Sequence, residues 1–485
     1  MSNQNTVSTP VSRRTFLNGM AAASGAAALQ AQSRPKPNVV FIMTDDHGAW
    51  ALGSAGCAEM QTPNIDRLAS RGITFQQAFA CTPVCSPSRA TFFSGKLPSH
   101  HGVQDFLTIA DSAGPTSHRF LEGHTTFAEV LKANGYMCGL VGKWHLGNDT
   151  EAQAGFDYWV TAPGGSGPYK DVEFFDNGKS VKNTGYKTDF VGDSALRFLD
   201  EHHENPFCLV VPFFAPHDPF NYQPEKYREP YKDSDFSCFP DDEPGHPQRR
   251  NQHDKHRGNR DSKLGYSALI TGVDANVGRI VDKLEELGVA DNTVVIFTAD
   301  HGYNCGHHRF WGKGNGTFPF NMYEQSIRVP LIWSHAGAIE AAATAEPMVS
   351  SYDFFPTLLD YLGIDAAPDK QRVGRSYAPF LRGERPQWPK ELYFEFANVR
   401  SIRTEHLKLV ERADGWGDEL FDLEVDPGEK TNRIGAAQYR DQVLALRGRL
   451  HRYFENAGAP PLEDWRSTTI QKLPMDQEGY YAWVE

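Results

Sequence analysis

Three features are scarce or missing in this 485-residue sequence, and each absence excludes a class of protein. No window stays apolar over the roughly 20 residues that a membrane-spanning helix needs, so stable membrane insertion is not expected. Basic residues are outnumbered, 48 Lys and Arg against 61 Asp and Glu, and the net charge of -13 argues against nucleic acid as a partner. The seven cysteines include no CxxC pair and no His/Cys spacing typical of zinc, which excludes a disulfide scaffold and a zinc module.

The remaining composition is ordinary for a globular protein, with 40% hydrophobic and 22% charged residues. A chain of this length can form one large domain, or a large domain with a smaller one. Because the protein is acidic, an anionic substrate would have to be attracted by a local basic cluster.

The N-terminal segment resembles an export signal. Arg13 and Arg14 stand directly before Phe16, Leu17 and a weakly apolar, alanine-rich stretch. This pattern is typical of a twin-arginine signal, which directs a folded protein across a bacterial inner membrane. We therefore expect residues 1–33 to be a signal peptide and the protein to be periplasmic or secreted. The alternative is a disordered tail with a chance arginine pair.

Short apolar runs alternate with helical patterns along most of the chain. Residues 62–75, 125–136 and 263–287 have the periodicity of amphipathic helices, and the third follows the 3.6-residue period most closely. Strands that alternate with helices predict an α/β fold, with a large, mostly parallel sheet between helices. The predicted buried strands are Val39–Met43, Tyr136–Val141, Phe207–Phe214, Val294–Phe297 and Val329–Trp333.

Two regions depart from this alternation. Residues 220–260 are too polar and too rich in proline for a core segment, which predicts a functional or disordered loop. After about residue 375, residues 391–412 and 418–427 have the pattern of antiparallel strands, and residues 440–455 that of a helix. We therefore divide the chain into a main domain, a smaller C-terminal α+β subdomain with an antiparallel sheet, and the leader. The main domain covers residues 34–374 and the subdomain residues 375–485.

Polar residues gather where the predicted strands end. Two strands end in the near-identical motifs TDDHG and TADHG, at residues 44–48 and 298–302, and two others end in GKWH and APHDP. Ligands of parallel α/β sheets bind beyond the carboxyl ends of the strands, so these side chains should meet at one edge. Each alone could be a turn residue, a helix cap or a structural histidine. Four strands with the same kind of residue favour an active site.

The acidic residues among these strand ends predict a cation site. Asp45, Asp46 and Asp300 would repel one another unless a cation lay between them. Carboxylate oxygens favour Ca²⁺ or Mg²⁺, whereas the nitrogen of His301 suits these ions less well.

Basic residues would surround an anion beside this cation. Arg89 offers a planar fork that suits a tetrahedral oxyanion, and Lys143 and Lys313 act as point charges. His145 and His217 add further donors. The lysines could be ordinary surface residues, but the glycines beside both indicate backbone held close to another group.

Cys85 begins the run Cys-Ser-Pro-Ser-Arg, in which Pro87 predicts the first turn of a helix. A helix N-terminus binds anions and lowers the pKa of a thiol, so an unmodified cysteine nucleophile is conceivable. Continued by ATFFSGKLPSHHG, however, this run resembles the signature of the type I sulfatases of the alkaline phosphatase superfamily. Matching motifs extend over most of residues 37–335, and residues 418–433 resemble the C-terminal subdomain of that family. Cys81 lacks the arginine four residues later and is expected to be a small buried hydrophobe.

The resemblance implies an alkaline-phosphatase-like catalytic domain over residues 34–374 and a modified residue at its centre. A formylglycine-generating enzyme would convert Cys85 to formylglycine, and the hydrated aldehyde would be the nucleophile. Asp45, Asp46, Asp300 and His301, together with residue 85, would bind Ca²⁺, with Mg²⁺ the less expected ion.

The resemblance also implies roles for the groups around the anion. Arg89 would hold the formylglycine, and Lys143 and Lys313 would bind the sulfate oxygens. His217 would protonate the leaving alcohol. His145 would take a proton from the second hydroxyl of the hydrated aldehyde, so that sulfate leaves by elimination.

Three alternatives remain open from the sequence. The first is a phosphodiesterase or phosphonate monoester hydrolase of the same superfamily, and the second is a non-catalytic, sulfatase-like binding protein. In the third, Cys85 stays an unmodified structural thiol. For an exported sulfatase, a sulfated saccharide is the expected substrate. Residues 241–261, with five basic and five acidic residues, would either grip a sulfated sugar chain or form a solvated loop.

Overall fold

The computed structural model describes Met1 and residues 36–240, 245–249 and 255–463. The predicted signal peptide lies outside the described residues apart from Met1, and so does part of the charged 241–261 segment. None of the helices in the described part of the chain has the length and apolar character needed to cross a membrane.

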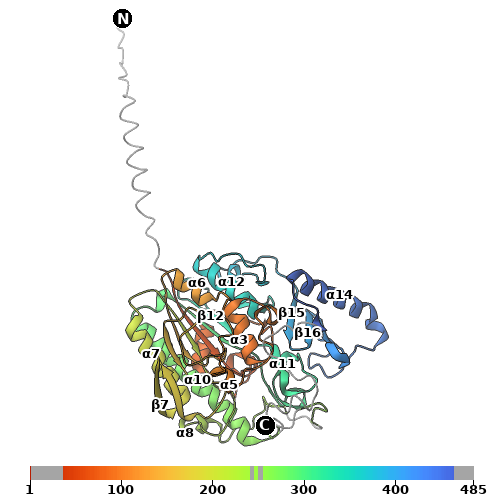
Figure 1. Ribbon diagram of the computed structural model, residues 1–485, viewed down its shortest axis with the longest axis horizontal. Helices are drawn as coiled ribbons and strands as arrows, with labels where there is room; N and C mark the ends of the chain where they lie inside the picture. Colours follow the sequence, from red (N-terminus) through yellow and green to blue (C-terminus); the bar gives the residue numbers. More distant parts are fainter. Residues whose placement is uncertain (2–35, 241–244, 250–254, 464–485) are drawn as a thin grey trace. The chain divides into compact units, whose positions relative to one another are not determined.

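The described residues form a ten-stranded, mostly parallel sheet, which confirms the predicted fold class (Figure 1). At its centre the first strand pairs in parallel with two others, with Phe41 opposite both Val210 and Ile296. From one edge to the other the strands are β13 (Ala343–Ala345), β2 (Ile73–Phe75), β12 (Leu331–Ser334), β9 (Thr293–Ala299), β1 (Asn38–Thr44), β8 (Phe207–Pro212), β4 (Met137–Gly142), β5 (Tyr158–Thr161), β6 (Lys170–Asp176) and β7 (Lys179–Tyr186).

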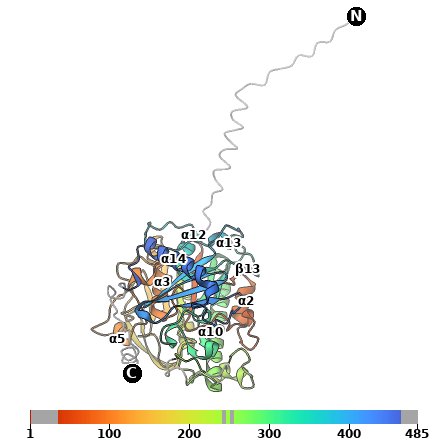
Figure 2. The same cartoon turned by 90° about the vertical axis from the view of Figure 1, so that its right-hand side faces the viewer.

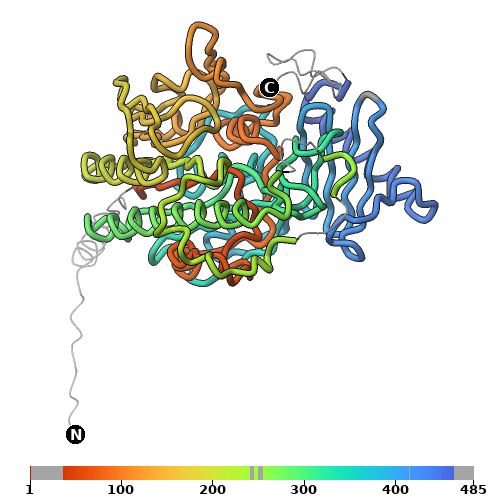
Figure 3. Tube along the Cα trace, turned by 90° about the horizontal axis from the view of Figure 1, so that it is seen from below, coloured from red at the N-terminus to blue at the C-terminus, as the bar shows by residue number. Residues whose placement is uncertain are grey.

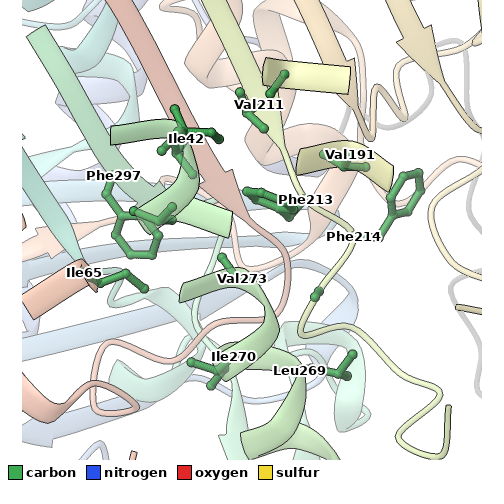
Figure 4. Packing of buried hydrophobic residues seen from close by; sticks show 14 of the residues in the cluster. Ile42, Ile65, Val191, Val211, Phe213, Phe214, Leu269, Ile270, Val273 and Phe297 are labelled. Atoms are coloured by element: carbon green, nitrogen blue, oxygen red, sulfur yellow. The ribbon is translucent and has the colours of Figure 1, made fainter. Parts of the chain in front are cut away.

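Helices cover both faces of this sheet because β1 is apolar on both sides. Val40 and Ile42 point into one core with α2 (Pro63–Ser70), α7 (Lys187–His202) and α10 (Arg260–Glu286). Figure 4 shows Ile42 in this layer with residues of α10. Val39, Phe41 and Met43 point into the other core. Its helices are α3 (Cys85–Ser94), α6 (Phe127–Ala133) and α12 (Ser351–Leu362).

A smaller antiparallel sheet follows, and its strands are those predicted from the sequence. In the described chain it consists of β15 (Glu391–Phe396), β16 (Val399–Thr404), β17 (Leu407–Arg412) and β18 (Glu419–Asp422). Helix α14 (Arg440–Ala457) lies across it and contributes Leu446 and Leu450 to a shared core (Figure 2). The boundary between residues 374 and 375 stays a prediction.

Short elements connect these layers. Those of the first half of the chain are β3 (Ala78–Phe79), α4 (Pro98–His101), α5 (Ile109–Ser112) and α8 (Glu225–Arg228). Those of the second half are β10 (Asn304–Cys305), η4 (His307–Arg309), β11 (Trp311–Gly312), α11 (Glu324–Ile327), β14 (Val349–Ser350) and α13 (Ala378–Leu381).

Several sequence predictions need correction. The helical pattern of residues 62–75 ends at Ser70, because Arg71 and Gly72 lead directly into β2. The strand predicted at Val329–Trp333 begins at Leu331 and runs antiparallel to both of its neighbours.

The prediction that residues 220–260 are too polar for a core was wrong for part of this segment. Most of its aromatic side chains, spaced between polar ones, are buried, among them Phe236 and Phe239, whereas Tyr222 is exposed. Cys238 also forms a disulfide with Cys57, across a Cα–Cα distance of 5.8 Å. Aromatic anchors and a covalent link therefore hold this stretch against the sheet.

Candidate active site

The carboxyl ends of the central strands bring the acidic motifs together, as the sequence predicted. Residues that follow β1 and β9 are adjacent because these strands pair up to Thr44 and Ala299. The Asp300 amide then donates to the Thr44 carbonyl at 2.9 Å. Asp46 has a φ of 60°, which turns the chain sharply just after the strand.

Four ligand groups converge at this edge. Asp45, Asp46, Cys85 and His301 each offer one ligand atom, and these atoms all lie within 4.8 Å of one another. All four side chains are buried. Oδ1 of Asp45 has no hydrogen-bond partner among the residues that the structure describes. A buried, unsatisfied carboxylate oxygen in such a group fits a hard divalent cation.

Asp300 lies next to this group rather than within it. Its Oδ2 is 2.9 Å from both Nε and Nη2 of Arg89, and its Oδ1 accepts from the His301 amide. Burial and Asp45 raise the pKa of Asp300 to about 6, although His301 and Arg89 oppose them. Arg89 also donates to the Lys143 carbonyl at 2.7 Å. Arg89 thus ties Asp300 to the strand end that carries Lys143.

Cys85 lies at the start of α3, facing two cationic groups. Its Sγ is 2.9 Å from Lys313 Nζ and 3.4 Å from His301 Nε2. Burial and Asp45 raise the pKa of the thiol, but Lys143, Lys313 and His301 outweigh them and hold that pKa well below its ordinary value. A nucleophile at this position is therefore surrounded by groups that stabilise negative charge.

The two lysines reach the carboxylates from the ends of two different strands, β4 and β11. Lys143 pairs with Asp45, and Lys313 Nζ lies 2.7 Å from Asp46 Oδ1. Lys143 follows Gly142, whose φ is 132° and where a Cβ would lie 2.1 Å from the Pro212 carbonyl. Only glycine fits there, which explains why a glycine precedes this lysine.

His145 is fixed in one tautomer. Its Nε2 lies 2.8 Å from the Leu107 carbonyl and must donate to it, so Nδ1 carries the lone pair. Nδ1 is buried and has no partner within the described residues. The Gly165 backbone lies against the ring, since a Cβ there would be 2.1 Å from His145. An imidazole with a free, buried acceptor suits a general base.

His217, unlike His145, lies among carboxylates. Its Nδ1 lies 2.9 Å from Asp218 Oδ1, and its Nε2 lies 3.8 Å from Asp46. Burial lowers the pKa of His217, but Asp46 and Asp45 outweigh this effect and raise it to about 9. A histidine that is protonated at neutral pH suits a general acid.

Sequence reasoning missed Asn321, which supports the Lys313 loop. Its Nδ2 donates to the carbonyls of Lys313 and Gly314, both at 3.1 Å, and its Oδ1 accepts from Ser326. The surrounding sequence gives no signal for this role, because the contacts depend on how the loop folds back on itself.

We expect Asn321→Leu to lower kcat/KM about 10-fold, because the Lys313 and Gly314 carbonyls lose their side-chain donor and keep only one backbone donor each, so that the loop shifts. Steady-state kinetics with a substrate that the protein turns over would measure the effect. Asn205→Leu, at an exposed position between α7 and β8, is the control and should behave like the wild type. Equal kinetics for Asn321→Leu and the wild type would show that Asn321 does not position Lys313.

Lys187 is a second residue that the sequence did not single out. Its Nζ lies 4.1 Å from the ring centroid of Phe214 and 5.3 Å from that of Tyr169. Within the described chain its ammonium has neither an ion pair nor a hydrogen-bond partner. Burial, with a smaller contribution from Lys143, lowers the pKa of Lys187 to about 7.

We expect Lys187→Met to stabilise the protein by about 1–3 kcal/mol at pH 7, because a buried, unpaired amine is replaced by an apolar chain of similar length. The pKa of Lys187 in the folded state lies below the unfolded value of about 10.4. The destabilisation is therefore full below pH 7 and disappears as the pH rises towards 10. Calorimetric Tm values at pH 7 and pH 10 would test this, and an unchanged or lower Tm at pH 7 would contradict it.

The fold and this edge of the sheet together define a hydrolase of the alkaline-phosphatase-like superfamily. The chain belongs to the sulfatase family, whose model matches residues 37–364, well over half of its length. A second model, described as N-sulphoglucosamine sulphohydrolase, C-terminal, matches residues 306–456. The protein is therefore a sulfatase, an enzyme that hydrolyses sulfate esters.

Individual relatives are similar over nearly the whole chain. An N-acetylglucosamine-6-O-sulfatase of Bacteroides thetaiotaomicron is 29% identical, with 86% of each chain covered. An ulvan-active sulfatase of Formosa agariphila is 28% identical, covering 89% of this chain and 83% of its own. A solved structure of a protein in complex with its substrate D-glucosamine-2-N,6-O-disulfate has a TM-score of 0.73 at 26% identity, covering 87% of this chain and 98% of its own.

Proposed function

We propose that this sulfatase removes sulfate from a sulfated saccharide, with formylglycine derived from Cys85 and a bound divalent cation. The observation that carries the proposal is the buried convergence of Asp45, Asp46, Cys85 and His301. Two of the relatives are named for sulfated sugars, N-acetylglucosamine-6-sulfate and ulvan, which supports a saccharide as the substrate.

The cation would be held by Asp45, Asp46, His301 and residue 85, with Asp300 beside them. Carboxylate ligands make Ca²⁺ the expected ion and Mg²⁺ the less expected one. When bound, the ion would polarise the sulfate ester and favour an ionised oxygen nucleophile at residue 85. Arg89 would hold Asp300 in place beside the ion through its contacts at 2.9 Å.

Two lysines would bind the sulfate group. Lys143 and Lys313 are buried, and their ammonium groups face the carboxylate cluster from different strand ends. Fixed cations in a water-poor site stabilise charge on the sulfuryl oxygens without reorganising during the reaction. The sulfur atom would then lie between the lysines and residue 85.

The two histidines would divide the proton transfers. With its pKa raised to about 9, His217 would donate a proton to the leaving alcohol oxygen. His145 would accept a proton at Nδ1 from the remaining hydroxyl of residue 85, because its Nε2 is occupied by the Leu107 carbonyl. Removal of that proton would release sulfate by elimination and restore the aldehyde.

Maturation and export would precede catalysis. Cys85 is buried, so a formylglycine-generating enzyme would have to act before this region folds. We also propose that residues 1–33 form a twin-arginine signal and that the protein acts in the periplasm or outside the cell. The proposed domains remain residues 34–374 and 375–485.

The proposal is tested by comparing kcat/KM on a panel of sulfated saccharides with that on matched phosphate diesters and phosphonate monoesters. We expect at least one sulfated saccharide to be preferred by about 100-fold or more. Faster hydrolysis of the phosphorus esters would favour the superfamily alternative. No turnover of any ester by protein with a mature residue 85 would favour a binding protein.

A further inference from the structure

A cavity of about 440 Å³ lies beside the Lys313 loop, outside the site described above. It is formed by the tip of the β10–β11 hairpin, residues near His246, and the end of the C-terminal sheet around Glu419 and Lys430. Figure 3 shows the green-to-turquoise part of the chain beside the blue C-terminal strands. A side-chain hydrogen bond joins them, since Lys408 Nζ of β17 donates to the Met322 carbonyl at 2.6 Å.

The two acidic residues at this cavity are already paired. Glu429 forms a buried ion pair with Lys408. Glu419 lies 2.6 Å from Arg412, which also donates to the Phe320 carbonyl through Nε and Nη2. The basic residues of β17 therefore neutralise the carboxylates and hold the loop that contains Asn321.

Two cations line the cavity. Among the residues that the structure describes, Arg309 and Lys430 form neither an ion pair nor a side-chain hydrogen bond. Arg309 is half-buried and Lys430 is exposed. Once the acidic residues are paired, the cavity has an uncompensated positive charge in a protein whose net charge is -13.

A wall of stacked rings adjoins these cations. His308 lies flat on Tyr323 with a centroid distance of 4.0 Å, and His246 Nε2 lies 3.0 Å from the Tyr323 hydroxyl. Burial lowers the pKa of His308 to about 3. Burial, together with the charges of Arg309 and Arg249, lowers the pKa of His246 to about 4. Both rings are therefore neutral at pH 7, and the positive charge comes from Arg309 and Lys430.

The backbone of the hairpin tip is unusual. His308 and Arg309 follow one another with φ values of 53° and 65°, a left-handed conformation that non-glycine residues rarely adopt. The conformation is held by a hydrogen bond from the His246 amide to the Arg309 carbonyl at 2.7 Å. Arg309 precedes Lys313 by four residues, a span of at most about 14 Å of extended chain. An extended oligosaccharide bound at Lys313 is long enough to cover this span.

We infer that this cavity is an accessory subsite for a second oxyanion, a sulfate or carboxylate group, on a saccharide whose scissile sulfate lies at Lys313. The inference rests on the proposed function. Arg309 offers a fork that binds a tetrahedral or planar oxyanion through two hydrogen bonds, and Lys430 adds a mobile point charge. The subsite would select multiply charged oligosaccharides over small sulfate esters.

The test compares the double variant R309Q/K430Q with the wild type on a sulfated heparin tetrasaccharide and on 4-nitrophenyl sulfate. We expect KM for the tetrasaccharide to rise about 10-fold with little change in kcat, whereas both constants for 4-nitrophenyl sulfate stay unchanged. K179Q/K182Q, on the exposed edge strand β7, removes the same charge elsewhere and should behave like the wild type.

An unchanged KM for the tetrasaccharide would overturn the subsite, and so would an equal rise in the control variant. Calorimetric binding of the tetrasaccharide to the same proteins separates the subsite from turnover. If the affinity falls only in R309Q/K430Q and the wild type hydrolyses no sulfate ester, the subsite is supported and the proposed function is contradicted. Equal affinities in all three proteins would refute the subsite whatever the activity.

Discussion

Cys85→Ala is expected to lower kcat for sulfate-ester hydrolysis by about 10⁴-fold or more, because the side chain that supplies the nucleophile is lost. The surrounding cations would still bind the sulfate group, so KM should change far less than kcat. Sulfate release under saturating substrate would measure the loss.

Cys81→Ala is the matched control for this substitution. Cys81 is also a free, buried thiol, four residues earlier in the chain, and burial, with Glu395, raises its pKa well above the ordinary value. It should therefore be an inert core residue, and its alanine variant should keep activity within a few fold of the wild type. Retention of more than about 1% of the activity by Cys85→Ala would contradict a covalent role for residue 85.

Asp45→Asn should lower kcat/KM about 10²- to 10³-fold and abolish the stabilisation that we expect from added Ca²⁺. Within the described part of the chain Asp45 Oδ1 is a buried oxygen without a hydrogen-bond partner. Lys143 and His217 hold the pKa of this carboxyl well below its usual range despite burial, so it is ionised. An amide at this position supplies a neutral oxygen, so a divalent cation binds more weakly.

The measurement is the Tm of metal-stripped protein titrated with Ca²⁺ and, separately, with Mg²⁺. A ligand that binds only the folded state raises Tm as its concentration exceeds Kd, and we expect this rise in the wild type but not in Asp45→Asn. Asp291→Asn, at the opposite end of β9, is the control. An equal Ca²⁺-dependent rise in Asp45→Asn and the wild type would show that Asp45 is not a ligand.

Much of the fold could be predicted because its main signals are local. The continuous apolar run of β1 and the 3.6-residue period of α10 are written in consecutive residues, and both elements were found within a few positions of their true ends. The TDDHG and TADHG motifs followed strands, so the topology of parallel sheets was enough to bring Asp45 and His301 together.

The features that sequence reasoning missed depend on contacts between distant segments. Cys57 and Cys238 are 181 residues apart and lie in no recognisable pattern. The burial of Phe236 and Phe239 was hidden by polar neighbours, because overall polarity says little about single aromatic anchors. Asn321 likewise acts through backbone carbonyls, whose positions only the folded loop defines.

The position of Asp300 shows a similar limit. The sequence placed it at the correct strand end, where its Oδ2 contacts Arg89, but it is not among the four residues whose ligand atoms converge in the structure, so its role as a ligand stays a prediction. Which of several nearby carboxylates faces a cation is decided by side-chain hydrogen bonds, and the order of residues along the chain does not reveal these.

The central claim is that residue 85 acts as formylglycine, and mass spectrometry of the peptide that ends at Arg89 tests it most directly. The protein should be produced in a host that has a formylglycine-generating enzyme. The account predicts an aldehyde or its hydrate at residue 85. Unmodified cysteine at this position, in protein that nevertheless hydrolyses sulfate esters, would contradict it.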